Sequence, residues 1–245
     1  MKTNIKNVIA VVLLPFLAIG CTHTLKTTKG PMTPVAAARL ERPVRLGFTS
    51  IGSDRLLEAA VKKVKQDASI ADAKEDFKPG GDYKPDFVCQ LAEDSQFKAS
   101  GQNFFITFPG FIVFSHALVG YKYKADITTH STLLDAKSNV VSQVDIKTPY
   151  EFRHCSFARG AAAGCCGWLA PGYGAAAIIP GAIFASSYDK RATSEFLEKA
   201  APSYSSYVAS RILDQLSQAQ ANCPPNASSK HEASEASANK VAGDQ

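Results

Sequence analysis

The stretch "YKYKADITTHSTLLDAKSNVVSQVDIKTPYEFRH", residues 121–154, contains two alternating runs of residues separated by a turn. In the first run, every second residue falls on one face that is apolar or small: Tyr121, Tyr123, Ala125, Ile127 and Thr129. The second run begins at Val140, directly after the turn-forming tripeptide "KSN" at 137–139. A period of two indicates a half-buried strand, and two such runs joined by a short turn indicate a hairpin. We therefore predict an antiparallel hairpin with one solvated face.

Upstream of this hairpin, the sequence predicts two strands with a helix between them. The strands are expected at "VRLGFTS" (44–50) and at "DFVCQLAEDSQF" (86–97). The helix is expected at "SDRLLEAAVKKVKQ" (53–66), with Ser53 or Asp54 as its N-cap. One face of that helix is apolar: Leu56, Leu57, Ala60, Val61 and Val64. This helix should pack against the sheet that contains the hairpin.

Downstream of the hairpin, a long helical pattern follows, for which Thr193 is the expected N-cap. Its later apolar stripe is formed by Tyr204, Tyr207, Val208, Ile212 and Leu216. The order of strands and helices predicts an α+β fold, a mostly antiparallel sheet with helices packed on one face. Two apolar inserts, 99–121 and 160–188, interrupt this order.

The two inserts carry no formal charge, and each is long enough for a membrane-spanning helix. Pro109-Gly110 divides the first insert, and Pro171 and Pro180 would break a continuous helix in the second. Three interpretations stay open. The inserts could pack on the sheet as core, rest in a membrane interface with Tyr173 and Trp168 as anchors, or oligomerise through small residues such as Gly160 and Gly164.

The N-terminus is typical of an exported protein. A basic segment, "MKTNIKN", precedes an apolar run from Val8 to Gly20, which is the pattern of a signal peptide. The run ends "LAIGC", and Cys21 at this position resembles the lipobox of bacterial lipoproteins. The resemblance implies cleavage before Cys21 and acylation of that cysteine. Because Thr22 follows and not Asp, the family's sorting rule implies the periplasmic face of the outer membrane.

These patterns divide the chain into four expected parts. They are a lipoprotein signal peptide (1–20), a lipidated N-terminus and flexible tether (21–43), an α+β periplasmic domain (44–217) and a disordered tail (218–245).

The cysteines after Cys21 leave several alternatives open. Disulfides are permitted in the periplasm, and the pairing among these residues is not determined by the sequence: Cys89, Cys155, Cys165, Cys166 and Cys223. A zinc site could combine His154 with Cys155, Cys165 and Cys166, but their spacing matches no common ligand pattern. Cysteine packed as a small hydrophobic residue is the simpler interpretation. We therefore expect no metal and no cofactor.

The sequence does not indicate a catalytic site. It contains no nucleophile elbow, phosphate loop or dinucleotide fingerprint. Arg153 and His154 could bind an anion as a cationic pair, but a salt bridge in the turn to Glu151 or Asp189 is the preferred explanation. Glu93 and Asp94 are adjacent on a predicted strand, and their side chains should point to opposite faces. Because the cations are scattered along the sequence, we also expect no nucleic-acid partner.

The order of elements over about residues 43–216 resembles an α/β domain found in three groups of envelope proteins. These are the curli secretion lipoprotein, the penicillin-binding-protein activator lipoproteins and the amino-terminal domain of the translocation protein TolB. The segments "FFITFPGFIVFSHALVGYKYKADITT" and "YEFRHCSFARG" also look like parts of uncharacterised bacterial lipoproteins. We expect a non-enzymatic, membrane-anchored envelope adaptor or assembly factor, with a protein partner or self-association. The alternative is a homo-oligomeric secretion or pore-forming lipoprotein.

Overall fold

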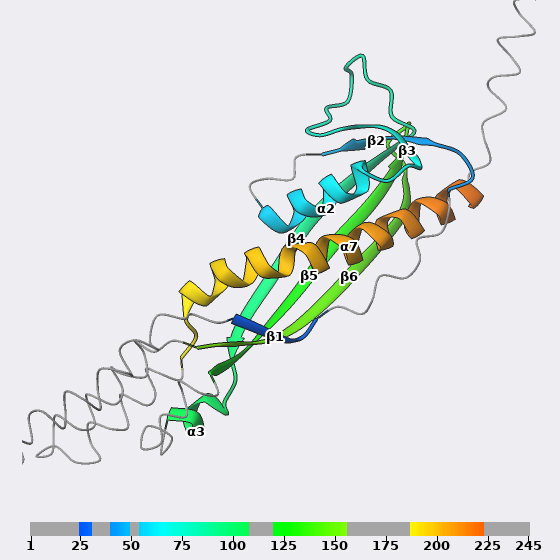
Figure 1. Cartoon of the computed structure of the whole chain (residues 1–245). Coiled ribbons are helices and arrows are strands. Elements are labelled where there is room, and N and C mark those ends of the chain that lie inside the picture. The colour runs from blue at the N-terminus through cyan, green and yellow to red at the C-terminus, as the bar shows by residue number, and fades with distance from the viewer. Residues whose placement is uncertain (1–24, 31–39, 50–53, 108–119, 156–186, 223–245) are drawn as a thin grey trace, which may run out of the picture. The chain divides into compact units, whose positions relative to one another are not determined.

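The α+β prediction is confirmed. The computed structural model describes residues 25–30, 40–49, 54–107, 120–155 and 187–222. In these residues a mostly antiparallel six-stranded sheet has the order β1-β6-β5-β4-β2-β3, and α2 and α7 cover one of its faces (Figure 1). The elements are β1 (Leu25–Lys29), β2 (Val44–Phe48), α2 (Arg55–Lys65), β3 (Ile70–Lys74), β4 (Phe87–Ala99), α3 (Asn103–Thr107), β5 (Tyr121–Asp135), β6 (Val140–His154) and α7 (Lys190–Asn222).

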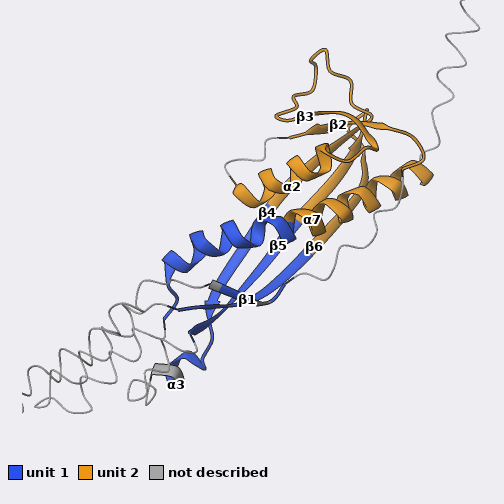
Figure 2. Cartoon of the chain, viewed as in Figure 1, with its two compact units in different colours: residues 1–33, 93–129, 147–204 blue, residues 34–92, 130–146, 205–245 orange. Residues whose placement is uncertain are grey.

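The chain forms two compact units, which Figure 2 shows in different colours. Unit 1 comprises residues 1–33, 93–129 and 147–204, and unit 2 comprises residues 34–92, 130–146 and 205–245. The long elements β4, β5, β6 and α7 each contribute one part to each unit.

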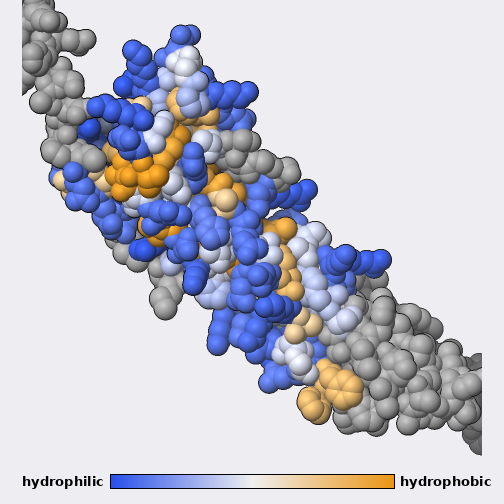
Figure 3. Space-filling view, turned by 180° about the vertical axis from the view of Figure 1, so that it is seen from behind, coloured by the Kyte–Doolittle hydropathy of each residue, from blue (hydrophilic) through white to orange (hydrophobic). Residues whose placement is uncertain are grey.

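The predicted hairpin is present as β5 and β6. Seven alternate residues of β5 are buried: Tyr121, Tyr123, Ala125, Ile127, Thr129, Ser131 and Leu133. The intervening residues form the open face of the sheet, which is hydrophilic over most of the described surface in Figure 3. At the turn, Asp135 accepts hydrogen bonds from the backbone N–H groups of Lys137 and Asn139, both at 2.8 Å. Ser138 has a φ of 66°, a left-handed conformation that tight turns use.

In unit 2, β2, α2 and β3 form a parallel β-α-β arrangement. Asp54 caps α2, since its Oδ1 accepts hydrogen bonds from Leu56 N at 2.9 Å and Leu57 N at 3.4 Å. All five residues of the predicted apolar face are buried. β2 also pairs in parallel with β4, so the sheet contains a parallel part that the sequence pattern did not predict.

The N-cap prediction for α7 is wrong by one turn. The helix begins at Lys190, and Asp189 caps it by accepting a hydrogen bond from Arg191 N at 3.0 Å. Thr193 lies inside the helix, and its Oγ1 is 2.6 Å from the Tyr188 hydroxyl. Asp was available one turn earlier, and its carboxylate is at least as good a cap as a threonine hydroxyl. Four of the five residues of the predicted apolar stripe are buried, and Tyr207 is half-buried.

Three predicted boundaries also need correction. Residues 25–29 of the expected tether form β1, which pairs with β6. The expected insert 99–121 overlaps β4 and β5 at its ends and contains α3, so residues 103–107 are helical. The expected tail begins too early, because α7 continues to Asn222. The last turns of α7 are held in unit 2 by Gln220, whose Nε2 donates to the Arg42 carbonyl at 3.0 Å.

Residues 108–119 and 156–186, which include most of both inserts, lie outside the described residues. No helix in the described ranges is both long and apolar enough to cross a bilayer.

Candidate functional site

The site that the fold builds most clearly lies at one end of unit 1, where β1 joins the sheet. β1 pairs antiparallel with the end of β6, so that Leu25 lies opposite His154 and Lys26 lies opposite Arg153. Cys21 precedes Leu25 by four residues. A fully extended segment of that length spans about 14 Å.

The start of β5 lies at the same end of unit 1. Gly120 precedes β5 and has a φ of +70°, and a Cβ placed on it would lie 2.8 Å from Cys155 Sγ and 3.3 Å from the His154 carbonyl. Only glycine accommodates both this conformation and this close approach without strain. Gly120 therefore brings the first residue before β5 against the first residue after β6.

α3 and the end of β4 are tied to the same place. Asn103, which is fully buried, brackets the backbone of Lys122: its Nδ2 donates to Lys122 O at 2.8 Å, and its Oδ1 accepts from Lys122 N at 2.7 Å. Ser100 N also donates to Lys122 O at 3.0 Å. Within α3, the Phe105 side chain is 71% exposed. An exposed phenylalanine on a one-turn helix is thus placed beside the strand ends of unit 1.

The described boundaries of the apolar inserts therefore converge. The first insert leaves the described region after Thr107 of α3 and re-enters it at Gly120. The second leaves after Cys155 and re-enters before Tyr188, whose ring contacts Phe97 and Tyr123 in unit 1. The N-terminal segment enters at Leu25, opposite His154. One end of unit 1 is thus the attachment point for the N-terminal cysteine segment and both charge-free segments.

The open face of the sheet is basic at this end. Lys122 and Lys124 of β5 alternate onto the open face, as do Glu151 and Arg153 of β6. The register places Lys26 opposite Arg153 and Lys29 opposite Glu151, which puts them on the same face. We call this set the basic cluster: Lys26, Lys29, Lys122, Lys124 and Arg153 around Glu151. Residues 25–29, 121–124 and 151–154 contain no acidic side chain besides Glu151.

Glu151 is the electrostatic centre of the basic cluster. Its carboxylate lies 3.2 Å from Lys122 Nζ and 3.8 Å from Lys124 Nζ. The hydrogen bond from Lys122, followed by the positive charges of Lys122, Lys29 and Lys124, lowers the pKa of Glu151. By formal charge, the basic cluster holds five cations and one carboxylate.

Behind the basic cluster, an aromatic core stiffens the strand ends on the face that α7 covers. Phe196 of α7 stacks on Phe152 with a centroid distance of 4.5 Å and contacts Tyr150 edge-on at 5.1 Å. Tyr123 contacts Phe152 at 5.5 Å and Tyr188 at 5.2 Å. Burial raises the pKa of Tyr150 to about 12, so its hydroxyl stays neutral in this core. The cations on the other face are therefore held on rigid strands.

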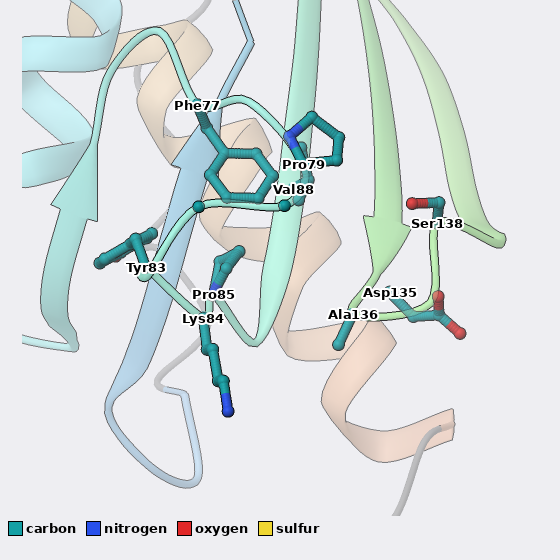
Figure 4. A pocket seen from close by; sticks show the side chains of 11 residues that line it. Phe77, Pro79, Tyr83, Lys84, Pro85, Val88, Asp135, Ala136 and Ser138 are labelled. Atoms are coloured by element: carbon teal, nitrogen blue, oxygen red, sulfur yellow. The ribbon is translucent and has the colours of Figure 1, made fainter.

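A hollow of about 350 Å³ lies within unit 2 (Figure 4). The loop between β3 and β4 lines it with Phe77, Pro79 and Tyr83, and the turn after β5 adds Asp135 and Ser138. The Phe77 ring packs directly on Gly47 of β2, where a Cβ would lie 2.8 Å from the ring. Asp135 is already committed to its own turn, and its hydrogen bonds to Asn139 lower its pKa. The other charged residue of its lining is Lys84. We assign no chemistry to this hollow.

The residues considered for catalysis and anion binding are separated by the fold. His154 faces α7, with Nε2 3.4 Å from Glu195 Oε2, whereas Arg153 lies on the open face beside Lys26. They do not form a cationic pair, because neighbouring residues of a strand point to opposite faces. For the same reason Glu93 and Asp94 diverge, and Glu93 Oε2 accepts a hydrogen bond from the Tyr204 hydroxyl at 3.1 Å.

Two cysteines can be placed, and both are thiols. Cys89 is buried and Cys155 is half-buried. Across the described ranges, no three His, Cys, Asp or Glu side chains gather closely enough to hold a metal ion. Cys21, Cys165, Cys166 and Cys223 lie outside the described residues.

The basic cluster was missed in the sequence because its cations come from three strands that are far apart along the chain. The one local signal was "YKYK" at 121–124, where alternation places two lysines on the same face. The contribution of β1 depends on a pairing across more than a hundred residues, and no local pattern indicates it.

Comparison with known proteins adds little. No protein-family model and no curated protein sequence matches the chain. Among solved structures, the chain has a weak likeness to the dodecamer of a PelC point variant from Paraburkholderia phytofirmans, with a TM-score of 0.23 and 13% sequence identity over 54% of this chain and 82% of that chain. A TM-score this low supports no inference about function.

Proposed function

We propose that this chain is a non-enzymatic outer-membrane lipoprotein, anchored through acyl chains on Cys21, which serves as an envelope adaptor or assembly factor. The observation that carries the proposal is the pairing of β1 with the end of β6. This pairing leaves only residues 22–24 between the candidate lipidation site and the folded sheet. The lipid would then hold one particular end of unit 1 at the bilayer. A long flexible tether would instead have allowed the domain to lie away from the bilayer in any orientation.

The position of the inserts supports the same arrangement. Both charge-free segments are attached to the end of unit 1 from which Cys21 would emerge, and exposed Phe105 lies within the first insert, on α3. Exposed apolar side chains at a lipid surface can bury their apolar area in the membrane interface, and removing that area from water is favourable. Of the three interpretations of the inserts, this geometry favours contact with the membrane interface.

The test of anchoring is the intact mass and fractionation of the chain expressed in a Gram-negative host. We expect the wild-type protein to begin at Cys21, to carry acyl chains and to sediment with membranes. Cys21→Ser should remove the acyl mass, and Cys155→Ser is the matched control that should keep it. Equal masses for wild type and Cys21→Ser would contradict the proposal.

The same Cys21→Ser protein tests the competing assembly function. Light scattering with and without detergent should give a monomer if the chain acts as an adaptor. A large ring-shaped assembly would instead favour the homo-oligomeric secretion or pore-forming alternative.

A further inference from the structure

Resting on the proposed anchoring, we propose that the basic cluster of unit 1 binds anionic phospholipid headgroups of the membrane that holds Cys21. The occupant is an anionic lipid surface, and the contact is made by the open face of the sheet at the end of β1, β5 and β6. The acyl chains would fix this end at the bilayer, and the basic cluster would set which face of the sheet turns toward the headgroups.

The first argument is charge complementarity. Five cations and one carboxylate lie on three adjacent strands, along β1, at the start of β5 and at the end of β6. Lys122 and Lys124 are engaged with Glu151, while Lys26 and Lys29 are exposed on the edge strand β1. Clustered lysines and arginines next to a membrane anchor attract anionic lipids.

The second argument is proximity. Cys21 precedes Leu25 by four residues, and a segment of that length reaches at most about 14 Å. Lys26 follows Leu25 directly, and a charge near a membrane surface acts over a Debye length of about 8–10 Å at physiological salt. The anchor would therefore keep the cluster within range of the headgroup charge.

The third argument is the choice between a lipid surface and a soluble anion. A soluble phosphate site uses converging donors in a concave pocket. Here the cations alternate along strands of an open sheet face, which fits an extended array of charges. Continuity with the anchored segment therefore favours the lipid surface.

The experiment uses the full mature chain carrying Cys21→Ser, so that the acyl chains cannot mask the electrostatic contribution. Binding is measured by co-sedimentation with vesicles of phosphatidylcholine alone and of phosphatidylcholine mixed with phosphatidylglycerol. We expect binding to require phosphatidylglycerol and to weaken as salt is added.

Three substitutions test the cluster itself. Each cation near a membrane surface contributes a factor of about five to the binding constant, so Lys29→Gln should weaken binding about fivefold. Glu151→Gln, which removes the only carboxylate of the cluster, should strengthen binding by a similar factor. Lys147→Gln is the matched control: this exposed lysine lies on the same face of β6 in unit 1, about 13 Å along the strand from Glu151, and its change should alter binding less than twofold. Circular dichroism melting curves should be alike for all three.

Equal weakening by Lys29→Gln and Lys147→Gln would overturn the proposal, since net charge alone would then explain the binding. So would equal binding to both vesicle types. A third result would also overturn the proposal, in favour of a soluble polyanion. In that result, the protein binds a soluble acidic polysaccharide but not vesicles, and the three variants rank in the same order of affinity. None of these results affects the acyl mass on Cys21, so failure of the cluster and failure of the anchor are distinguishable.

Discussion

The Tyr204 hydroxyl of α7 lies 2.6 Å from Thr129 Oγ1 of β5, and both side chains are fully buried. The same hydroxyl donates to Glu93 Oε2 of β4 at 3.1 Å. One tyrosine therefore joins the helix to two strands of unit 1. Buried hydroxyls are costly unless they are hydrogen-bonded, so this contact specifies how α7 packs on the sheet.

We predict that Tyr204→Phe destabilises the protein by about 1–3 kcal/mol, because it leaves the buried Thr129 hydroxyl without this partner. Chemical denaturation monitored by circular dichroism measures the free energy of unfolding. Tyr207→Phe, three residues along the same helix and only half-buried, is the control and should cost less than about 0.5 kcal/mol. Equal costs for the two variants would show that the buried network is not the cause.

A second prediction concerns the buried polar pair of unit 2. Ser131 Oγ donates to Gln215 Oε1 at 2.8 Å, and Gln215 Nε2 donates to Ser131 O at 3.4 Å. Gln215→Leu should cost about 1–3 kcal/mol, because it leaves the Ser131 hydroxyl buried without this acceptor. The double variant Ser131→Ala/Gln215→Leu should recover part of that loss. Strictly additive effects would argue against direct coupling.

A third prediction concerns the thiols. Burial raises the pKa of Cys89 to about 12, and the hydrogen bond with Ser131 offsets this only in part. We expect iodoacetamide, followed by peptide mass mapping, to label half-buried Cys155 in the native protein and to label Cys89 only after denaturation. Labelling of native Cys89 at the rate of Cys155 would contradict the prediction.

The same shift sets a direction for stability against pH. Because the folded pKa of Cys89 is higher than the unfolded value, its contribution is fully present below about pH 9 and is lost as the pH rises toward about 12. Cys89→Ala should therefore reduce the loss of stability between these values. Unfolding curves at a series of alkaline pH values measure this change, and an unchanged slope would contradict the assignment.

A fourth prediction concerns the close approach at the strand ends of unit 1. Gly120→Ala should destabilise the protein by more than about 1 kcal/mol, because the left-handed backbone and the contact with Cys155 Sγ both exclude a Cβ. Gly101→Ala is the control, since a Cβ there meets no atom within 4 Å. Adding Cys155→Ala should restore only part of the loss, because the strained φ remains. Full restoration would show that the contact alone matters.

The candidate site could be predicted only in fragments. Cys21 was proposed from a local pattern, and the alternation of "YKYK" placed Lys122 and Lys124 on one face. Lys26 and Lys29 were expected in a tether, because "LKTTK" has too little apolar content to indicate a strand. Their place beside Arg153 and Glu151 arises from the pairing of β1 with β6. An edge strand gains most of its stability from backbone hydrogen bonds, which any sequence can form.

By itself, the sequence determined the elements in which apolar residues recur with the period of a strand or a helix. The hairpin of residues 121–154 and the apolar face of α2 were predictable because period-two and helical patterns are local consequences of one buried face. Only the tertiary structure decided which distant segments pair: β1 with β6, β3 and β4 in parallel with β2, and Tyr204 with Thr129. The physical reason is that strand pairing and buried hydrogen bonds depend on groups brought together from far apart in the chain, whereas local alternation reflects only which face of a segment meets water.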